Sequence, residues 1–587
     1  MSFALDAYAA RSCAVKTQNA FHPGVTLPVG TPDESLADQF LGGGRFEDEV
    51  IAEMLGGFEG TVADLRPLLN KERAAQVVAC ADAMSSGVDL IIAGALPVDL
   101  EGHRRGRPDL WVRGPDAAGG GPGYYPLEIK FHRVLEQRPT GARTLPLSPV
   151  TRPRREGAAP VGDVAFRMGG RSGDLLQVAH YWRLLEASGR AADGGAAAGL
   201  IGTDDTTVNG ERAVVWMDLD EPMFNSHHLV GIDLPSGSLS ALERYDQHHA
   251  FLVRVALNAL AQKGSPDDPA LLAPIVRREC LRCPWWAHCR PLLDDDDLSL
   301  RIDKSPLDIV EIRVLRDQGI ATVAELANTD LEPLLPRYLP MVTHRPGAEE
   351  RLRLAAHRAQ LMAAGVELER IGTAPIELPA AEIEIDLDIE TSADDRVYLW
   401  GFLLHGPDGL SGYRGFARFD RLDAGAEVAL AAEALAWLHE LCRSASVKVF
   451  HYSDYETIRL RRLAAASDHP EIAWAAQWAS EGFVDLFELV RRHFFGVRGL
   501  GLKAVARASS GFRWRDKEPG GLNSLRWHAE AVGAGDAETR ERARGRILDY
   551  NEDDVRATWE VRRWLRGLNA TSPASWPPRP SIDQGDD

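Results

Sequence analysis

Alternating apolar and polar residues predict two short strands near the middle of the first half of the chain. The segments GRPDLWVR and YYPLEIKFHRV carry apolar or β-branched residues at every second position, and a glycine-rich link joins them. We therefore expect a hairpin. Asp109 lies on its first strand, and Glu128 and Lys130, two residues apart on the second, share one face.

Helical periodicity predicts two helices that flank this hairpin. Upstream, GGGRFEDEVIAEML predicts a helix start with Glu47 in the first turn. Downstream, GDLLQVAHYWRLLEA is amphipathic and carries Gln177 and Tyr181 one turn apart. The Pro-, Gly- and Arg-rich stretch between 137 and 173 follows neither period, so we expect it to be a basic loop beside the hairpin.

A second region of strict alternation begins at position 381. In AEIEIDLDIETS every second residue is acidic, which predicts a strand with one strongly negative face. Like charges this close repel one another, and on a buried strand a cation would be needed to hold them together. We therefore expect Asp388 and Glu390 to bind a cation.

Later segments add acids at helical positions. SVKVFHYSDYETIRLRRL predicts a strand that leads into a helix with Glu456 in its first turn. ILDYNEDDVRATWEVRRWL predicts a helix that carries Tyr550 and Asp554 one turn apart. Two further polar candidates lie between these segments, Asp485 and Lys503.

The region between 305 and 358 predicts two short helices around Gly319, followed by a third helix. The turn GIATV resembles that of a helix-hairpin-helix element, whose backbone N–H groups would grip a phosphate without reading sequence. A helical spacer that only sets the distance between domains is an equally good interpretation.

Length and composition change this picture only in part. A chain of 587 residues exceeds one ordinary core, so we expect three domains. The net charge of -20 does not exclude nucleic-acid contact, which depends on local patches. Because no apolar run is long enough to span a membrane and the first residues lack a signal-peptide pattern, we expect a cytoplasmic protein.

Six cysteines are too few for a disulfide scaffold, and three of them cluster. RRECLRCPWWAHCRP places Cys280, Cys283 and Cys289 at a spacing that suits zinc or an iron-sulfur cluster, each of which takes four ligands. We favour Cys13 as the fourth ligand because it lies in a polar stretch. The other candidates are Cys80, which lies in an apolar helical pattern, Cys442 and His288.

The ordered set of Glu47, Asp109, ExK and QxxxY resembles the RecB-type branch of the PD-(D/E)XK nucleases. The resemblance implies that Glu47, Asp109 and Glu128 bind metal and that Lys130 is catalytic, with Gln177 and Tyr181 serving the active-site helix or contacting the DNA backbone. One cysteine before this core and three after it resemble the iron-sulfur staple of RecB-type nucleases. That likeness implies a [4Fe-4S] cluster on Cys13, Cys280, Cys283 and Cys289, with zinc as the alternative.

The acidic strand and the Tyr550 helix resemble RNase H-like exonucleases of the DEDD class, tyrosine subtype. This resemblance implies a two-metal site in which Tyr550 orients the attacking water. Glu456 stands where the family usually has aspartate, and Asp454 is a competing ligand. The implied metal ligands are Asp388, Glu390, Glu456 and Asp554.

The order of these parts resembles a bacterial family of RecB-like nucleases and predicts a multidomain α/β chain. Its expected parts are a restriction-endonuclease-like PD-(D/E)XK nuclease with the iron-sulfur staple (1–295), a helix-hairpin-helix-like linker (296–374), an RNase H-like exonuclease domain (375–570) and a disordered tail (571–587).

The expected function is Mg²⁺- or Mn²⁺-dependent hydrolysis of nucleic acid, with exonuclease action on DNA ends or single strands favoured, in repair, recombination or defence. Because no phosphate loop of the form GxxxxGK[ST] occurs, any helicase would be a separate partner. The alternative is a non-catalytic DNA-binding adaptor for such a helicase or for a repair complex.

Overall fold

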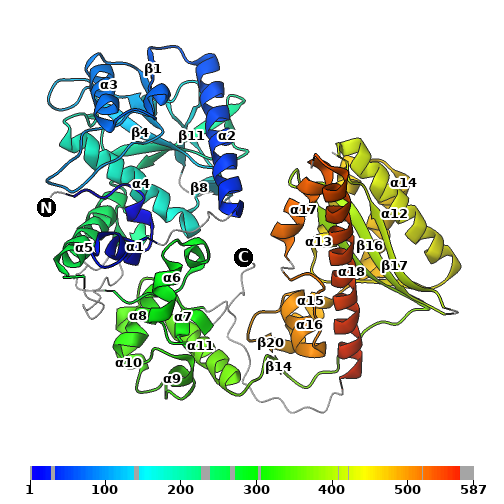
Figure 1. The fold of residues 1–587 in the computed structure, drawn as a ribbon. Helices are drawn as coiled ribbons and strands as arrows, with labels where there is room; N and C mark the ends of the chain where they lie inside the picture. The colour runs from blue at the N-terminus through cyan, green and yellow to red at the C-terminus, as the bar shows by residue number, and fades with distance from the viewer. Residues whose placement is uncertain are drawn as a thin grey trace. The chain divides into compact units, whose positions relative to one another are not determined.

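The chain divides into two compact units in a computed structural model (Figure 1). The N-terminal unit comprises Met1–Ser299, Asp308–Gly319 and Glu332–Ala348, and the C-terminal unit comprises the rest. In the described chain, every helix is too short or too polar to cross a bilayer. The residues described are 3–27, 34–137, 144–225, 238–264, 272–301, 306–407, 409–420, 422–517, 520–533 and 535–568.

A mixed sheet with the strand order β1-β2-β3-β4-β9-β11-β6-β7 forms the centre of the N-terminal unit. β3 and β4 pair as antiparallel neighbours, which confirms the predicted hairpin, and β9 lies parallel to β4. The strands are β1 (Val62–Asp64), β2 (Leu90–Ile92), β3 (Leu110–Arg113), β4 (Tyr124–Ile129), β6 (Leu145–Pro149), β7 (Ala159–Val161), β9 (Ala197–Ile201) and β11 (Glu211–Asp218), with β10 (Thr207–Val208) paired to β11.

The helix before the hairpin differs from the prediction. α2 spans Glu34–Gly57, so Glu47 lies in its interior and not in its first turn. Phe46, Val50 and Met54, spaced one turn apart, are buried in the core of the unit. This packing holds the helix to the sheet, and the helix runs through Gly42–Gly44 because tertiary contacts outweigh the weak helical preference of glycine.

The basic stretch after β4 also differs from the prediction. It contributes β6 and β7 to the main sheet, and β8 (Val164–Phe166) pairs with β5 (Leu135–Gln137). β6 is held by pairing to β11 and by burial of Leu147, which a sequence without strand period did not reveal. Residues 138–143 of this stretch lie outside the described residues.

Two long helices position the remaining candidates of this unit. α4 (Met168–Ala187) packs against β4 and β9 and carries Gln177 and Tyr181. α5 (Ala241–Ala261) packs against α1 (Ala14–Phe21) and brings the N-terminal segment close to the segment that follows α5.

The predicted helices around Gly319 are present as α8 (Ile309–Asp317) and α9 (Val323–Ala327), and the third is α11 (Ala348–Ala363). The N–H groups of Ala321 and Thr322 donate to the Glu325 carboxylate at 2.7 Å and 2.9 Å. Because this carboxylate already uses the donors that a phosphate would need, these contacts favour the spacer interpretation. The predicted tail from 571 lies outside the described residues.

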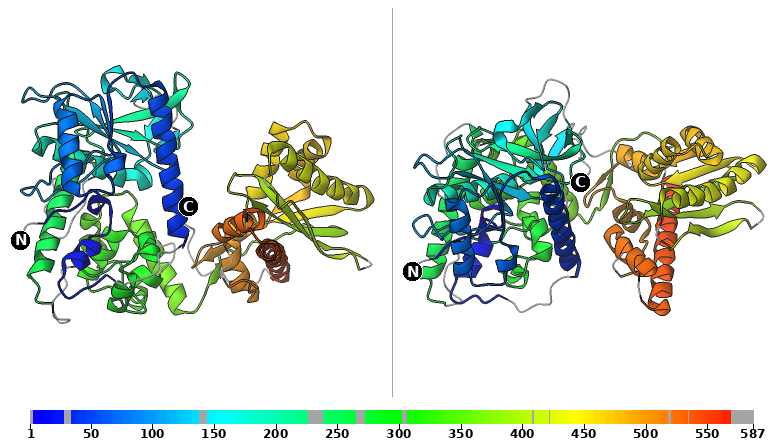
Figure 2. Two further views of the ribbon diagram at one scale, coloured as in Figure 1. Left: turned by 45° about the horizontal axis from the view of Figure 1, so that its top comes forward. Right: turned by 90° about the horizontal axis from the view of Figure 1, so that it is seen from above.

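The C-terminal unit holds a five-stranded sheet in the order β17-β16-β15-β18-β19. α12 (Ala424–Ser444) and α14 (Pro470–Gly482) cover one face, and α18 (Ala537–Gly567) crosses the other (Figure 2). Leu430, Leu435 and Leu438 pack with the odd-numbered residues of β15, so its acidic even-numbered residues face α18. The strands are β15 (Ile383–Thr391), β16 (Val397–His405), β17 (Ser411–Ala417), β18 (Val447–His451) and β19 (Phe483–Asp485).

Candidate functional sites

Three carboxylates meet where β15 faces α18. Oxygen atoms of Asp388, Glu390 and Asp554 all lie within 4.8 Å of one another. No other group of three or more His, Cys, Asp or Glu ligand atoms in the described part of the chain is this compact. Alternation along β15 gives the first two residues one face, and α18 supplies the third.

Burial and mutual repulsion raise the pKa of all three acids above their ordinary values. Burial and the neighbouring Asp554 raise the pKa of Glu390 to about 8, and burial raises the pKa of Asp554 to about 6. Burial, together with Asp554, Glu390 and Glu456, raises the pKa of Asp388 well above its usual range. A divalent cation would favour the charged form of all three acids.

A neutral donor fixes each of these carboxylates. The Asn551 amide donates to Asp388 Oδ2 at 2.7 Å. The Ser524 hydroxyl donates to Glu390 Oε2 at 2.8 Å, and the Trp514 indole donates to Asp554 Oδ1 at 2.6 Å. Such bonds orient the acids without neutralising them, so their negative charge remains available to a cation.

Tyr550 and Lys503 lie beside the three acids. Lys503 Nζ donates to the Tyr550 hydroxyl oxygen at 2.9 Å. Burial and the nearby Asp554 raise the pKa of Tyr550, so this phenol keeps its proton. The positive charge of Lys503 partly opposes the rise in the pKa of Glu390 and of Asp554, so this charge acts on the cluster without contacting it.

The fourth predicted ligand, Glu456, lies outside the compact group. It is buried, and its carboxylate lies 3.5 Å from His451 Nδ1. Its charge nevertheless contributes to the raised pKa of Asp388. Asp454 is exposed at the start of α13 (Tyr455–Ala466). Asp485 accepts bonds from the N–H groups of Phe487 and Ser453 and caps α15 (Leu486–His493).

The other acids of β15 have a different environment. Arg562 forms an ion pair with Asp386 at 2.6 Å and also bonds to Glu384, which Arg566 contacts as well. Two acids of this face are therefore balanced by arginines of α18. The expectation that the whole buried face requires a cation is therefore wrong for Glu384 and Asp386. For Asp388 and Glu390 it stays a prediction, since among the described residues no basic side chain contacts either carboxylate directly.

In the N-terminal unit four of the six predicted residues, Glu128, Lys130, Gln177 and Tyr181, are joined by hydrogen bonds. Lys130, directly after β4, donates from Nζ to Glu128 Oε2 at 2.7 Å and to Gln177 Oε1 at 2.8 Å. The Gln177 amide donates to Glu128 at 3.0 Å and to the Tyr181 hydroxyl oxygen at 3.3 Å. Gln177 of α4 therefore contacts both Lys130 and Glu128.

The two remaining acids of this site, Asp109 and Glu47, form no hydrogen bond with these four side chains within the described residues. Asp109 precedes β3 by one residue and accepts a bond from the N–H of Ile129 at 2.7 Å. Burial, with the charges of Glu128 and Glu47, raises the pKa of Asp109 well above its usual range. Burial and Glu128 likewise raise the pKa of Glu47.

Sequence reasoning missed a second layer on this site. The Arg11 guanidinium donates to Gln177 Oε1 at 2.7 Å and pairs with Asp174 at 2.9 Å. His132 Nε2 lies 2.8 Å from the same Asp174 carboxylate. Asp174 stands one turn before Gln177 on α4, and this spacing was the only signal in the sequence.

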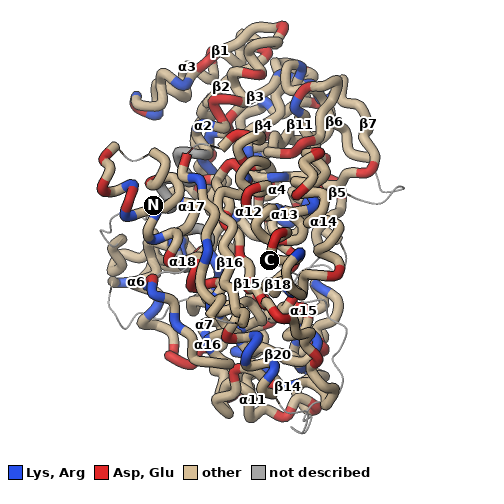
Figure 3. Tube along the Cα trace, turned by 90° about the vertical axis from the view of Figure 1, so that its right-hand side faces the viewer, with Lys and Arg blue, Asp and Glu red and all other residues tan. Residues whose placement is uncertain are grey.

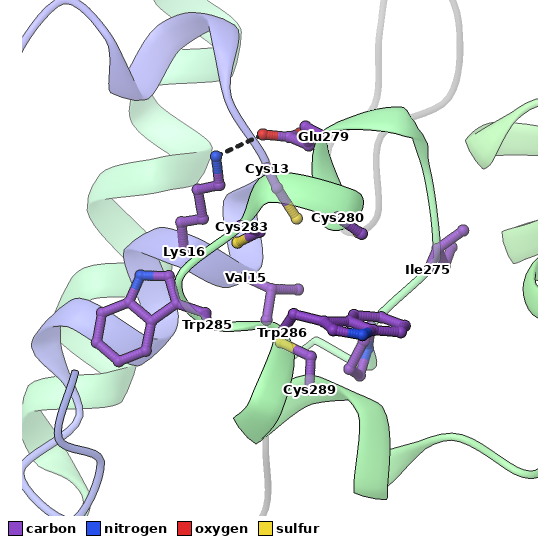
Figure 4. Close-up of a pocket in the computed structure, with 11 residues that line it drawn as sticks. Cys13, Val15, Lys16, Ile275, Glu279, Cys280, Cys283, Trp285, Trp286 and Cys289 are labelled. Carbon is purple, nitrogen blue, oxygen red and sulfur yellow. Dashed lines mark ion pairs between the residues drawn. The ribbon is translucent and has the colours of Figure 1, made fainter. Parts of the chain in front are cut away.

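Four cysteines line one pocket of the N-terminal unit (Figure 4). Cys13 precedes α1, and Cys280, Cys283 and Cys289 come from the turns and short helix around 278–289. Burial raises the pKa of Cys289 to about 11, with contributions from Cys13 and Cys283. Cys80 is buried in α3 (Arg73–Ser85), Cys442 lies on α12, and His288 does not line this pocket.

Charged residues of both signs are interspersed along the trace (Figure 3). Residues 386–566 match the family described as the RNase H superfamily. This match covers the three-acid cluster and supports an RNase H-like domain there, with a metal-dependent, nuclease-type activity on nucleic acid. No curated protein and no solved structure matches the chain.

Proposed function

We propose that the chain is a Mg²⁺- or Mn²⁺-dependent exonuclease whose principal site is the cluster of Asp388, Glu390 and Asp554. The observation that carries this proposal is the meeting of three partly or fully buried carboxylates within 4.8 Å, each oriented by a neutral donor. An arrangement with uncompensated charge is costly to the fold unless a cation completes it.

The residues of the chain have distinct roles in this reaction. The three carboxylates would hold a divalent ion, which supplies Lewis-acid polarisation of the scissile phosphate. Tyr550 keeps its proton and orients the attacking water, and Lys503 fixes the phenol through its 2.9 Å bond. The water oxygen would form the new bond to phosphorus as the water gives a proton to bulk solvent, and the leaving oxygen would depart with the electrons of the broken P–O bond and take up a proton from solvent. Glu456 would serve a second ion.

The N-terminal unit is proposed as a second nuclease site of the PD-(D/E)XK type. Glu47, Asp109 and Glu128 would hold metal, and Lys130 would stabilise the charge that develops on the phosphate. Gln177 bonds to both Lys130 and Glu128, so it aligns the two.

The cysteine pocket is proposed to hold a [4Fe-4S] cluster that joins the two ends of this unit. The pocket combines four thiols with Trp285 and Trp286 as apolar cover. A tetrahedral zinc site would place sulfurs about 3.8 Å apart. Within the described residues, no three of these sulfurs lie within 4.8 Å of one another, which favours the larger group.

An assay of cleavage tests the principal proposal against the adaptor alternative. End-labelled single-stranded, duplex and flapped DNA would be incubated with full-length protein in Mg²⁺, Mn²⁺ or EDTA. The proposal predicts that the DNA is shortened from one end, and that this happens with Mg²⁺ or Mn²⁺ but not in EDTA. Binding of equal strength with and without metal, and no cleavage in any condition, would instead establish a non-catalytic adaptor. Roles in DNA repair and a partner helicase remain part of the proposal.

A further inference from the structure

A cavity of about 300 Å³ lies in the N-terminal unit, apart from the residues assigned to either nuclease site. It is lined by the start of α1 with Cys13 directly before it, the middle of α5, the segment 272–277, the first turns of α8 and His344. This volume is at the lower end of the range of about 300–1,000 Å³ in which ligand pockets fall. The cavity can therefore admit a small organic ligand.

One arginine of this cavity has no counter-ion. Among the described residues, Arg313 of α8 makes no hydrogen bond or ion pair, and the nearby charges of Asp317 and of Cys13, a proposed cluster ligand, offset only part of the effect of its burial. The neighbouring charges differ in this respect. Arg277 pairs with Glu279, and Asp308 pairs with His344 at 2.5 Å. The charge left for a ligand is therefore positive.

Burial makes this arrangement unfavourable in the empty cavity. It lowers the pKa of Arg313 below its ordinary value and that of Arg244, which also lines the cavity, to about 10. An anion bound at Arg313 would offset the cost of burying its charge. The remaining wall is largely apolar and includes Val15, Phe251 and Ile309.

A nucleotide combines the two properties that this cavity would recognise. Its phosphate suits the planar fork of an arginine, and its base and sugar suit an apolar wall that carries an aromatic ring. We propose that this cavity binds the phosphate group of a nucleotide, with Arg313 as its main contact and Arg244 as the second. The nucleotide is either a free mononucleotide or the phosphorylated end of a strand.

This inference goes beyond the proposed nuclease function because it uses none of the nuclease residues. Its test compares Arg313→Gln with Arg337→Gln. Arg337 is exposed on α10 (Leu335–Tyr338), so the control removes the same charge from the same unit. Both full-length variants would first be matched to wild type in iron content and thermal midpoint.

The first arm measures binding of deoxyadenosine monophosphate by calorimetry. The second measures fluorescence polarisation of one oligonucleotide that carries a 5′-phosphate, a 3′-phosphate or only hydroxyl ends, in EDTA to prevent cleavage. In at least one arm, Arg313→Gln should weaken phosphate-dependent binding by roughly tenfold or more, while Arg337→Gln should not.

The pattern of the two arms identifies the source of the phosphate. Loss confined to calorimetry identifies a free mononucleotide, and loss confined to one phosphorylated oligonucleotide identifies a strand end. If wild type does not bind the mononucleotide and does not distinguish the three oligonucleotides, the proposal is overturned. Equal weakening by both arginine variants overturns it too, because that result reflects general electrostatic attraction.

Discussion

The two acidic sites of this chain solve the same electrostatic problem in opposite ways. In the N-terminal unit, Lys130 lies 2.7 Å from Glu128 and balances one buried acid internally. Among the described residues of the C-terminal unit, Asp388, Glu390 and Asp554 bond directly only to neutral groups, and Lys503 bonds to Tyr550 instead of to a carboxylate. One acid of the first site is therefore balanced by a lysine in direct contact, whereas the three clustered acids of the second site have no such partner, so we expect the second site to depend more strongly on a metal.

Removal of one acid from the C-terminal cluster should have the largest effect. Asp388→Asn keeps the shape of the side chain but removes a ligand charge, so metal-dependent cleavage at this site should fall on the order of 10³-fold.

Lys130→Ala should lower a separate activity, cleavage at the N-terminal site, by about 10²-fold or more, because the charge that develops on the phosphate is no longer stabilised. Rates on single-stranded and duplex substrates would be measured for each variant and for the double variant.

If each substitution affects its own substrate class and the double variant is inactive, the sites act independently. If Lys130→Ala removes all cleavage and Asp388→Asn none, the C-terminal unit is a binding module. The reverse result would leave the N-terminal unit as a scaffold.

Neutralisation of Glu128 should destabilise the N-terminal unit. Glu128→Gln would leave Lys130 buried without its ion-pair partner, at a cost of about 3–5 kcal/mol in the free energy of unfolding. Hydrogen-deuterium exchange of the β4 peptides and calorimetry would measure this loss. The double variant Glu128→Gln with Lys130→Met serves as the control, because removal of both charges should restore most of the stability. If Glu128→Gln were as stable as wild type, the ion pair between Glu128 and Lys130 would not be what balances the buried charges of this site.

Neutralisation of Glu390 should stabilise the C-terminal unit in the absence of metal. The pKa of Glu390 is raised from an ordinary 4.5 to about 8, so the folded state binds more protons than the unfolded state between these values. Without metal, stability should therefore fall as the pH rises across this window. Glu390→Gln should raise the thermal midpoint in EDTA at pH 8 and change it little at pH 5. Mg²⁺ should stabilise wild type but not the variant. If Glu390→Gln were less stable than wild type at pH 8 in EDTA, the contrast between the two acidic sites would be wrong.

Periodicity predicted those parts of both sites in which the residues lie on the same strand or helix. The alternation of 381–392 placed Asp388 and Glu390 on one face, and helical spacing placed Tyr550 with Asp554. It could not show that Arg562 would neutralise Asp386, because that contact joins residues 176 positions apart. Ser524 and Trp514 were missed for the same reason, since each reaches its acid across the fold. Glu47 was placed correctly in a helix, but only tertiary packing determines where that helix begins.

The donors around the three acids provide the finest test of the comparison. Trp514→Phe keeps an aromatic ring but removes the 2.6 Å bond to Asp554, so that carboxylate is oriented less firmly. The Mg²⁺ concentration for half-maximal cleavage should rise by about tenfold, as is typical when a hydrogen-bond partner of a metal ligand is lost. Saturating Mg²⁺ should restore the maximal rate, because the ligand itself is intact.

Trp478→Phe is the matched control for this change. Trp478 lies on α14 and packs against the face of the sheet that carries the odd-numbered residues of β15, so its substitution leaves the acids untouched. It should leave the Mg²⁺ requirement unchanged. A lowered maximal rate that excess Mg²⁺ does not restore in Trp514→Phe would mean that the indole acts on the fold of the site and not on its affinity for metal. The contrast between a metal-dependent and an internally balanced site would then rest on the acids alone.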